Sequence, residues 1–187
     1  MTKREVILQA TLSLVKREGF EGVTIRKIAS EAEVNVGLVN YYFGSKDKLI
    51  NEVIQILVTS LKDTFTLLDD ETTAPKERLK RFLIQYVTIH QQYPFIGLKL
   101  LSQGTLLFQS QRDFVTFIKA IGLRKMHDTI QEITGESDAE KTTIMMSHLL
   151  GATFLPTLME PLFEKVTGLP LPDMEKRIDL MLERYFS

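Results

Sequence analysis

The side chains best suited to specific polar contacts lie in one short segment, residues 34–49, which reads VNVGLVNYYFGSKDKL. Asn40 can form two hydrogen bonds with adenine, and exposed valine or leucine side chains can contact thymine methyl groups. Lys46 lies at a predicted helix start, where a cation opposes the helix dipole and a nearby phosphate would resolve that conflict. Tyrosine hydroxyls also bind phosphates, and Tyr41 is a stronger candidate than Tyr42. The major groove of DNA is therefore a suitable partner for this segment.

Residues that could perform catalysis or bind metals are few and scattered. The chain has no cysteine, which excludes disulfides, thiolate metal sites and cysteine nucleophiles. Its histidines, His90, His127 and His148, lie on separate predicted helices without HxxxH or HxxE spacing. No GxSxG, phosphate-loop or paired-carboxylate motif occurs. We therefore predict no enzyme activity, no metal site and no cofactor, and we interpret the histidines as core or pocket residues.

Composition indicates an ordinary globular protein. The chain has 187 residues, of which 44% are hydrophobic and 25% charged, and its formal net charge is −1. Residues 1–48 carry eight Lys/Arg against six acids, a net charge of +2, whereas the remainder carries −3. The N-terminal part is thus the better candidate to face a polyanion. With neither a signal peptide nor a run of about 18 apolar residues, we expect a cytoplasmic protein that does not bind membranes.

Apolar residues recur with helical spacing along almost the whole chain, which predicts an all-α protein with about nine helices. The first seven predicted helices cover residues 3–19, 24–32, 36–43, 46–68, 75–93, 95–107 and 109–134, an eighth begins at Ser137 and Asp138, and the last covers residues 173–186. Thr2, Thr24 and Ser45 are the expected N-caps of three of them. Pro156 and Pro161 are expected to kink or end the eighth.

The N-terminal helices follow the order of a helix-turn-helix: a helix, a short helix, a three-residue turn and another short helix. Its small core is predicted to consist of Ile28, Ala29, Val34, Val39 and Phe43. On the third helix this leaves outward Asn35, Val36, Gly37, Leu38, Asn40 and Tyr41. We predict a helix-turn-helix domain over residues 1–47 and a larger helical domain over residues 48–187.

The stretch TIRKIASEAEVNVGLVNYYFGSKDKL resembles the DNA-binding signature of the TetR family of bacterial regulators. The matching positions are Thr24, Ile28, Ala29, Val34, Tyr41, Tyr42, Phe43, Lys46 and Leu49. The resemblance covers roughly residues 5–52. It departs from many members at Glu33, where glycine is common, at Leu38, where threonine or serine is common, and at Asn40, where tyrosine is common. An operator sequence therefore cannot be transferred from a relative.

The resemblance and the outward face together predict a set of DNA-binding residues. They are Thr24, Arg26, Asn35, Val36, Gly37, Leu38, Asn40, Tyr41, Tyr42 and Lys46. Asn40 is the best base-reading candidate, because an exposed helix face offers it no other role. Alternatives remain for two types of residue: Arg26 could simply be solvated, and the tyrosines could pack against the first and fourth helices.

The C-terminal part predicts self-association. The eighth helix is apolar on nearly all sides and the ninth is amphipathic, so their apolar surface must be covered by the same chain or by a partner. The resemblance implies that the last two long helices pair with those of a second copy, giving a homodimer that binds a palindromic operator in double-stranded DNA. Half-sites would lie one or more helical turns apart, at about 34–36 Å per turn.

The resemblance also implies that the larger domain binds a small molecule. The candidate pocket residues are Phe82, Tyr86, His90, Phe95, Phe117, Ile121, Met145, His148 and Phe154, which would suit a largely apolar ligand with one polar group. Taken singly, each could equally be plain core. The expected function is a transcriptional repressor released by such a ligand. The alternative is a helical small-molecule-binding protein or enzyme whose helix-turn-helix no longer reads DNA.

Overall fold

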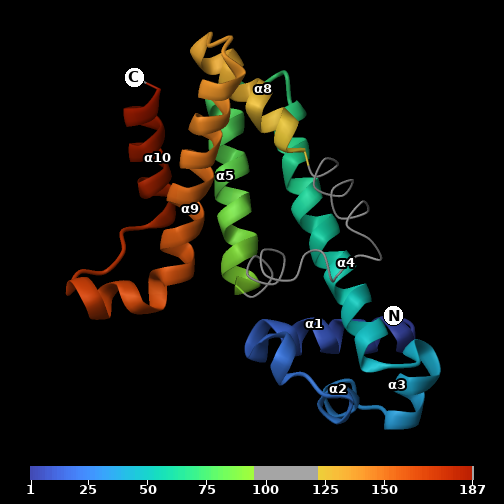
Figure 1. Cartoon of the computed structure of the whole chain (residues 1–187). Coiled ribbons are helices and arrows are strands. Elements are labelled where there is room, and N and C mark those ends of the chain that lie inside the picture. The colour runs from blue at the N-terminus through green and yellow to red at the C-terminus, as the bar shows by residue number, and fades with distance from the viewer. Residues whose placement is uncertain (95–121, 187) are drawn as a thin grey trace. The chain divides into compact units, whose positions relative to one another are not determined.

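The computed structural model describes residues 1–94 and 122–186, and these residues contain eight α-helices, one short 3-10 helix and no strand (Figure 1). The prediction of an all-α protein is confirmed. The elements are α1 (Lys3–Gly22), α2 (Ile25–Glu31), α3 (Val36–Phe43), α4 (Lys46–Thr64), the 3-10 helix η1 (Phe65–Asp69), α5 (Pro75–Gln92), α8 (Leu123–Thr134), α9 (Ala139–Thr167) and α10 (Met174–Tyr185). The helix predicted over residues 95–107 lies outside the described residues.

The described helices fall into two compact units, and α4 runs through the division between them. Of the described residues, one unit holds 1–60 and 92–94, and the other holds 61–91 and 122–186. The domain boundary predicted after residue 47 remains a prediction.

The N-terminal helix begins with a complete capping box. The Thr2 side chain accepts a hydrogen bond from the Glu5 backbone N–H at 3.3 Å, and the Glu5 carboxylate accepts one from the Thr2 N–H at 2.7 Å. Helical geometry breaks at Gly19, with φ 70° and ψ 174°, before a last turn that ends at Gly22. The predicted end at Gly19 is therefore a kink within α1, and the buried Phe20 follows it.

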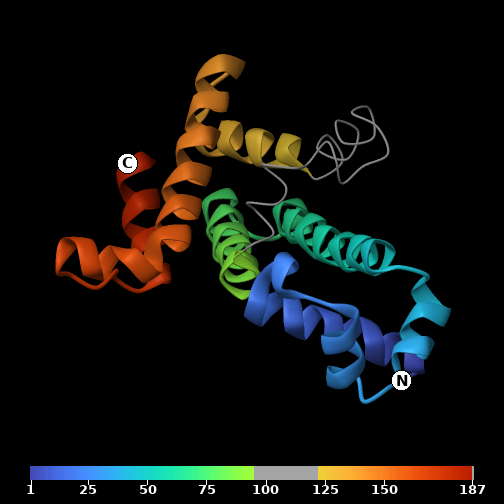
Figure 2. The same ribbon diagram turned by 60° about the horizontal axis from the view of Figure 1, so that its bottom comes forward.

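Helices α2 and α3 pack against each other and against α1 across a turn formed by residues 32–35 (Figure 2). The Val34 N–H donates to the Ala29 carbonyl at 2.9 Å. Glu33 has φ +52°, the left-handed conformation that glycine adopts without strain. This explains why glycine is common at the position in the sequence pattern described above. Buried Ile28 and Val39 then close the small core between the two helices.

The second unit consists of helices packed around one continuous apolar core. Figures 1 and 2 both place α9 beside α5 and α10. The buried core residues are Phe65, Leu68, Leu79, Phe82, Leu83, Met126, Ile130, Leu149, Ile178 and Leu182. Burying one large apolar side chain of this kind stabilises a fold by about 1.5–3 kcal/mol, so this cluster positions the surrounding helices.

Two predicted helix boundaries differ in the structure. The predicted helix over residues 109–134 does not run through Gly122, because Gly122 has φ +110° and α8 begins after it. A Cβ atom at Gly122 would lie 2.7 Å from the Cβ atom of Phe65, so the close packing of this turn on η1 requires glycine. The eighth predicted helix, α9, contains both Pro156 and Pro161 and continues to Thr167, with a bend of its axis in the C-terminal part (Figure 1).

Candidate nucleic-acid interface

Helix α3 begins with a side-chain N-cap from Asn35, one of the predicted DNA-binding residues. The Asn35 side-chain oxygen accepts a hydrogen bond from the Leu38 N–H at 2.7 Å. Asparagine is a preferred N-cap residue, so this role could have been recognised from its place before the helix. The cap uses one acceptor site of the Asn35 side-chain oxygen and leaves its NH₂ group available to a ligand. Leu38 is half-buried, so it is less available than predicted.

The remaining outward residues of α3 form an exposed surface, which we call the α3 face: Val36, Gly37, Asn40, Tyr41 and Tyr42. The Tyr41 side chain is 81% exposed and packs edge-on against Tyr42, with ring centroids 5.3 Å apart. Packing of Tyr41 against the first and fourth helices, the alternative left open by the sequence, does not occur. Apolar and amide groups thus dominate a surface that is exposed to solvent.

The opposite side of α3 fixes it to its neighbours. Val39 and Phe43 are buried, as their spacing predicts. The Arg4 guanidinium lies 5.1 Å from the centre of the Phe43 ring and forms an ion pair with Glu52 on α4. The end of α3 is therefore held against both α1 and α4.

Ion pairs neutralise two of the acids close to the turn. Arg17 forms two hydrogen bonds with the Glu31 carboxylate, at 2.8 and 3.0 Å, and this pairing lowers the pKa of Glu31. The Lys27 ammonium donates to the Glu18 carboxylate at 2.5 Å and to the Gly22 carbonyl at 2.9 Å. Lys27 is therefore already engaged within the unit.

Two predicted phosphate-binding cations have no such partner. Arg26 is exposed on α2 and Lys46 is half-buried at the first position of α4, and neither forms an ion pair with another described residue. Thr24 caps α2 by accepting the Lys27 N–H at 3.3 Å, and its hydroxyl proton stays available. The predicted cap Ser45 likewise accepts the Lys48 N–H at 3.3 Å. These residues surround the α3 face with donors suited to phosphate.

In the second unit, four of the predicted pocket residues meet in one aromatic row. Ring centroids are 5.9 Å apart for Phe82 and Tyr86, 4.3 Å for Tyr86 and His90, and 5.0 Å for His90 and Phe154. Phe65 of η1 extends the row, with its ring centroid 4.6 Å from that of Phe82. It is not among the predicted pocket residues. We call these five residues the aromatic row.

Burial sets the protonation of the two polar members of the aromatic row. It raises the pKa of Tyr86 to about 12, so the hydroxyl stays neutral. It also lowers the pKa of His90, although the hydrogen bond from Nδ1 to the Tyr86 carbonyl, at 2.8 Å, opposes this shift. The row is therefore an uncharged environment at neutral pH.

The other predicted pocket residues are not part of the row. Met145 packs against the core cluster of the unit. His148 is exposed, and its Nδ1 lies 2.8 Å from the Tyr185 hydroxyl of α10 in a hydrogen bond. Phe95, Phe117 and Ile121 lie outside the described residues.

Helix α9 carries a line of exposed residues, which we call the α9 stripe: Ile144, His148, Ala152, Leu155, Met159, Leu162 and Val166. Successive members are three or four residues apart, a spacing that places neighbours on the same side of a helix. Five are large apolar residues with 40–78% of their surface exposed. The predicted excess of apolar surface on this helix is thus present in the structure.

Residues 1–94 and 122–186 contain no group of three His, Asp or Glu side chains able to hold a metal ion. Over the same ranges, no helix is both long enough and apolar enough to cross a membrane. The geometry of α2, its turn and α3 defines the chain as a helix-turn-helix protein.

Comparison with known proteins narrows this class to one family. Residues 7–53 match the family described as "Bacterial regulatory proteins, tetR family". The transcriptional repressor NicS from Pseudomonas putida is 28% identical over 124 residues, which span 64% of this chain and 58% of NicS. The transcriptional regulator BetI from Vibrio atlanticus is 33% identical over 64 residues, which span 34% of this chain and 32% of BetI. Residues 7–53, which contain the helix-turn-helix, therefore match the N-terminal domain of TetR family regulators.

The fold likeness extends over the whole length. The crystal structure of AibR in complex with isovaleryl coenzyme A and operator DNA matches with a TM-score of 0.70 at 15% identity, covering 99% of this chain and 98% of AibR. This likeness supports the architecture of both units, described separately above.

Proposed function

We propose that the protein is a sequence-specific DNA-binding transcriptional regulator, and that it acts as a homodimeric repressor released by a small, largely apolar ligand. The α3 face carries this proposal. Its exposed Val36, Asn40 and Tyr41 are unusual for a surface that meets only water, and they suit base edges and methyl groups in a major groove. Arg26 and Lys46, which form no ion pair with another described residue, suit the flanking phosphates.

A homodimer follows from the length of α3 and from the α9 stripe. Eight residues form α3, so one copy can read only a few base pairs. A twofold pair would read a palindrome, and the α9 stripe with exposed Leu180 of α10 offers the apolar surface for pairing. The names of NicS, a repressor, and BetI, a regulator, support the assignment, and no catalytic role is proposed.

The aromatic row is the proposed location for part of the ligand site. It combines apolar rings with two neutral polar groups, Tyr86 and His90, which suits a ligand with one polar group. AibR, which shares the fold, has been crystallised with an acyl coenzyme A and DNA together. The ligand would release DNA by favouring a conformer in which the two α3 helices no longer match the spacing of the half-sites.

The test of DNA reading is selection of bound sequences from a random duplex library by the purified protein at two salt concentrations. The expected result is an enriched palindrome whose affinity falls steeply with salt, with a log–log slope of about −0.9 per neutralised phosphate. Equal, weak binding to all sequences would contradict the proposal and favour a small-molecule-binding protein that does not read DNA.

Two matched pairs of variants locate the contact on the α3 face. Asn40→Ala should weaken binding to the selected palindrome by about 1–3 kcal/mol and relax selection at one base pair of each half-site, whereas exposed Asn51→Ala on α4 should not. Lys46→Gln should reduce the salt slope by about one per lost phosphate contact, whereas Lys62→Gln on the same helix should leave it unchanged. If Asn40→Ala binds as tightly as the parent with its fold intact, another face reads the DNA.

A further inference from the structure

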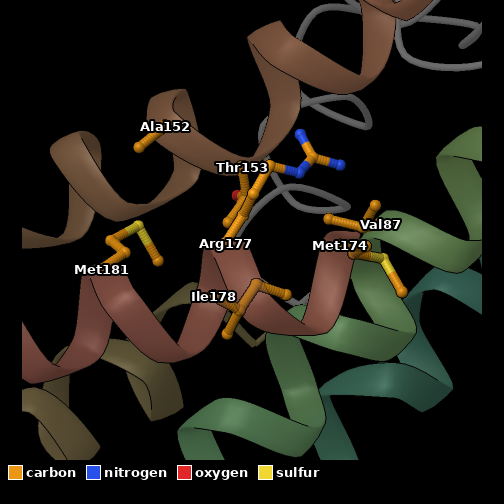
Figure 3. Close-up of a pocket in the computed structure, with 7 residues that line it drawn as sticks. All are labelled: Val87, Ala152, Thr153, Met174, Arg177, Ile178 and Met181. Carbon is orange, nitrogen blue, oxygen red and sulfur yellow. The ribbon is translucent and has the colours of Figure 1, made fainter. Parts of the chain in front are cut away.

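A cavity in the second unit lies between α5, α9 and α10 (Figure 3). Its volume is about 90 Å³. Its lining residues are Val87, Ala152, Thr153, Met174, Arg177, Ile178 and Met181. Val87 follows Tyr86 and precedes His90 by three residues on α5, and Thr153 precedes Phe154 on α9, so the cavity borders the aromatic row along both helices.

Arg177 is the only charged residue among the described lining residues, and its Nε–H group lacks a hydrogen-bond partner. The Nε atom is buried without a hydrogen-bond acceptor among the described residues. The neighbouring acids Glu175 and Asp179 on α10 pair with Lys80 instead of Arg177. The Lys80 Nζ atom lies 3.3 Å from the Glu175 carboxylate and 2.6 Å from the Asp179 carboxylate. A buried donor on a cation is costly when it is left unpaired, so an acceptor is expected here.

The other walls of the cavity define what that acceptor can belong to. Val87, Ile178 and the two methionines present apolar, adaptable surfaces. The Thr153 hydroxyl donates to the Leu149 and Leu150 carbonyls at 2.8 and 3.0 Å, so its proton is already used. A ligand therefore meets one cationic donor group surrounded by methyl, methylene and thioether groups.

We propose that this cavity binds a small organic anion: a short-chain carboxylate whose head group accepts hydrogen bonds from Arg177 and whose alkyl chain contacts Met174 and Met181. A cavity of about 90 Å³ is well above the roughly 10–15 Å³ that one water requires, which allows a chain of a few carbons. The carboxylate would join α5, α9 and α10, so it would stabilise the unit. None of the seven lining residues named above belongs to the aromatic row, and the proposal does not depend on DNA binding.

The experiment is isothermal titration of the full chain with acetate, butyrate and hexanoate, and with butanamide as an uncharged analogue of butyrate. Butyrate is expected to bind and to raise the melting temperature, and butanamide should bind at least ten-fold more weakly. Arg177→Gln should weaken butyrate binding at least ten-fold. Lys176→Gln removes an exposed cation from the neighbouring position of α10 and should bind butyrate like the parent.

A second measurement identifies the place of binding without any change in Arg177. Methyl NMR of methionine-labelled protein should show butyrate-dependent shifts for Met174 and Met181, with Met126 of the core unaffected. The proposal is overturned if no acid binds at 10 mM, if butyrate and butanamide bind alike, or if the shifts fall on methionines outside the cavity. It is equally overturned if folded Arg177→Gln binds butyrate as the parent does.

Discussion

Glu33 holds a backbone conformation that its side chain disfavours. Its φ of +52° is left-handed, which costs an L-residue about 1–2 kcal/mol relative to its ordinary conformations. Glycine has no such cost but loses more chain entropy on folding, about 0.5–1 kcal/mol. Glu33→Gly is therefore expected to raise the free energy of unfolding by up to about 1 kcal/mol, as measured by urea denaturation.

The matched control is Glu33→Ala, which removes the same charge but keeps a Cβ atom in the left-handed conformation. Because its backbone conformation stays strained, Glu33→Ala should not raise the free energy of unfolding as Glu33→Gly does. If alanine stabilised the protein as much as glycine, the acid and not the turn geometry would be the source of the strain.

His90 makes stability depend on pH in a definite direction. Burial lowers its pKa in the folded protein below the value of about 6.5 in the unfolded chain, so between the two values the unfolded chain binds more protons. The contribution of His90 to stability is thus fully present above pH 6.5 and is lost as the pH falls below it. His90→Leu should show a smaller loss of stability between pH 7.5 and 5.5 than the parent.

Urea denaturation of both proteins across this pH range checks the difference. Other groups titrate in the parent and variant alike, so only the change in slope reports on His90. Parallel curves would mean that the imidazole is no less easily protonated when folded than when unfolded.

At the scale of the element, the α9 stripe predicts where the subunits associate. Leu155 is 55% exposed near the middle of the stripe, and a carboxylate there would be desolvated opposite another copy. Leu155→Glu is expected to weaken dimerisation by about 2 kcal/mol or more while α9 stays helical. Light scattering coupled to size-exclusion chromatography, over a dilution series, measures the change.

The control places the same carboxylate on another exposed position, Gln85→Glu on α5. This variant should remain as dimeric as the parent. A Leu155→Glu protein that still dimerises fully would show that α9 pairs through different residues or not at all.

At the scale of the whole molecule, the proposed dimer and the proposed DNA face depend on each other. Linking two reading heads raises affinity for a double site by about 10²–10⁴ over a single site without any new contact. The parent should therefore bind a selected palindrome about 10²–10⁴ times more tightly than its isolated half-site. Monomeric Leu155→Glu should bind both almost equally, as titration by fluorescence anisotropy would show.

Helix existence and helix starts were predictable from the sequence because their causes are local. Thr2 and Thr24 each cap a helix by accepting from the backbone N–H group three residues away, and both were predicted as caps. The buried pair Val39 and Phe43 follows from helical spacing alone. Asn35 also stands directly before a helix, as an N-cap residue does, but it was predicted only as a DNA-binding residue.

Other features needed the tertiary structure, because they join residues far apart in the chain. Arg17 and Glu31, 14 residues apart, meet only when α1 packs on α2. This pairing neutralises the negative charge of Glu31. Gly122 interrupts the predicted helix because the turn must approach Phe65, 57 residues earlier. No local pattern encodes either contact.

The sequence by itself determined the all-α class, the helix-turn-helix and the exposure of Val36, Gly37, Asn40 and Tyr41, because each depends on spacing within a few turns of helix. Only the tertiary structure decided which cations beside that face form no ion pair with another described residue, and that Phe65, Tyr86, His90 and Phe154 form one row while His148 pairs with Tyr185. It alone shows that the Nε atom of Arg177 is buried without a hydrogen-bond acceptor among the described residues. Helical period states which side of a helix is apolar, but the partner that each side meets depends on how separate helices pack.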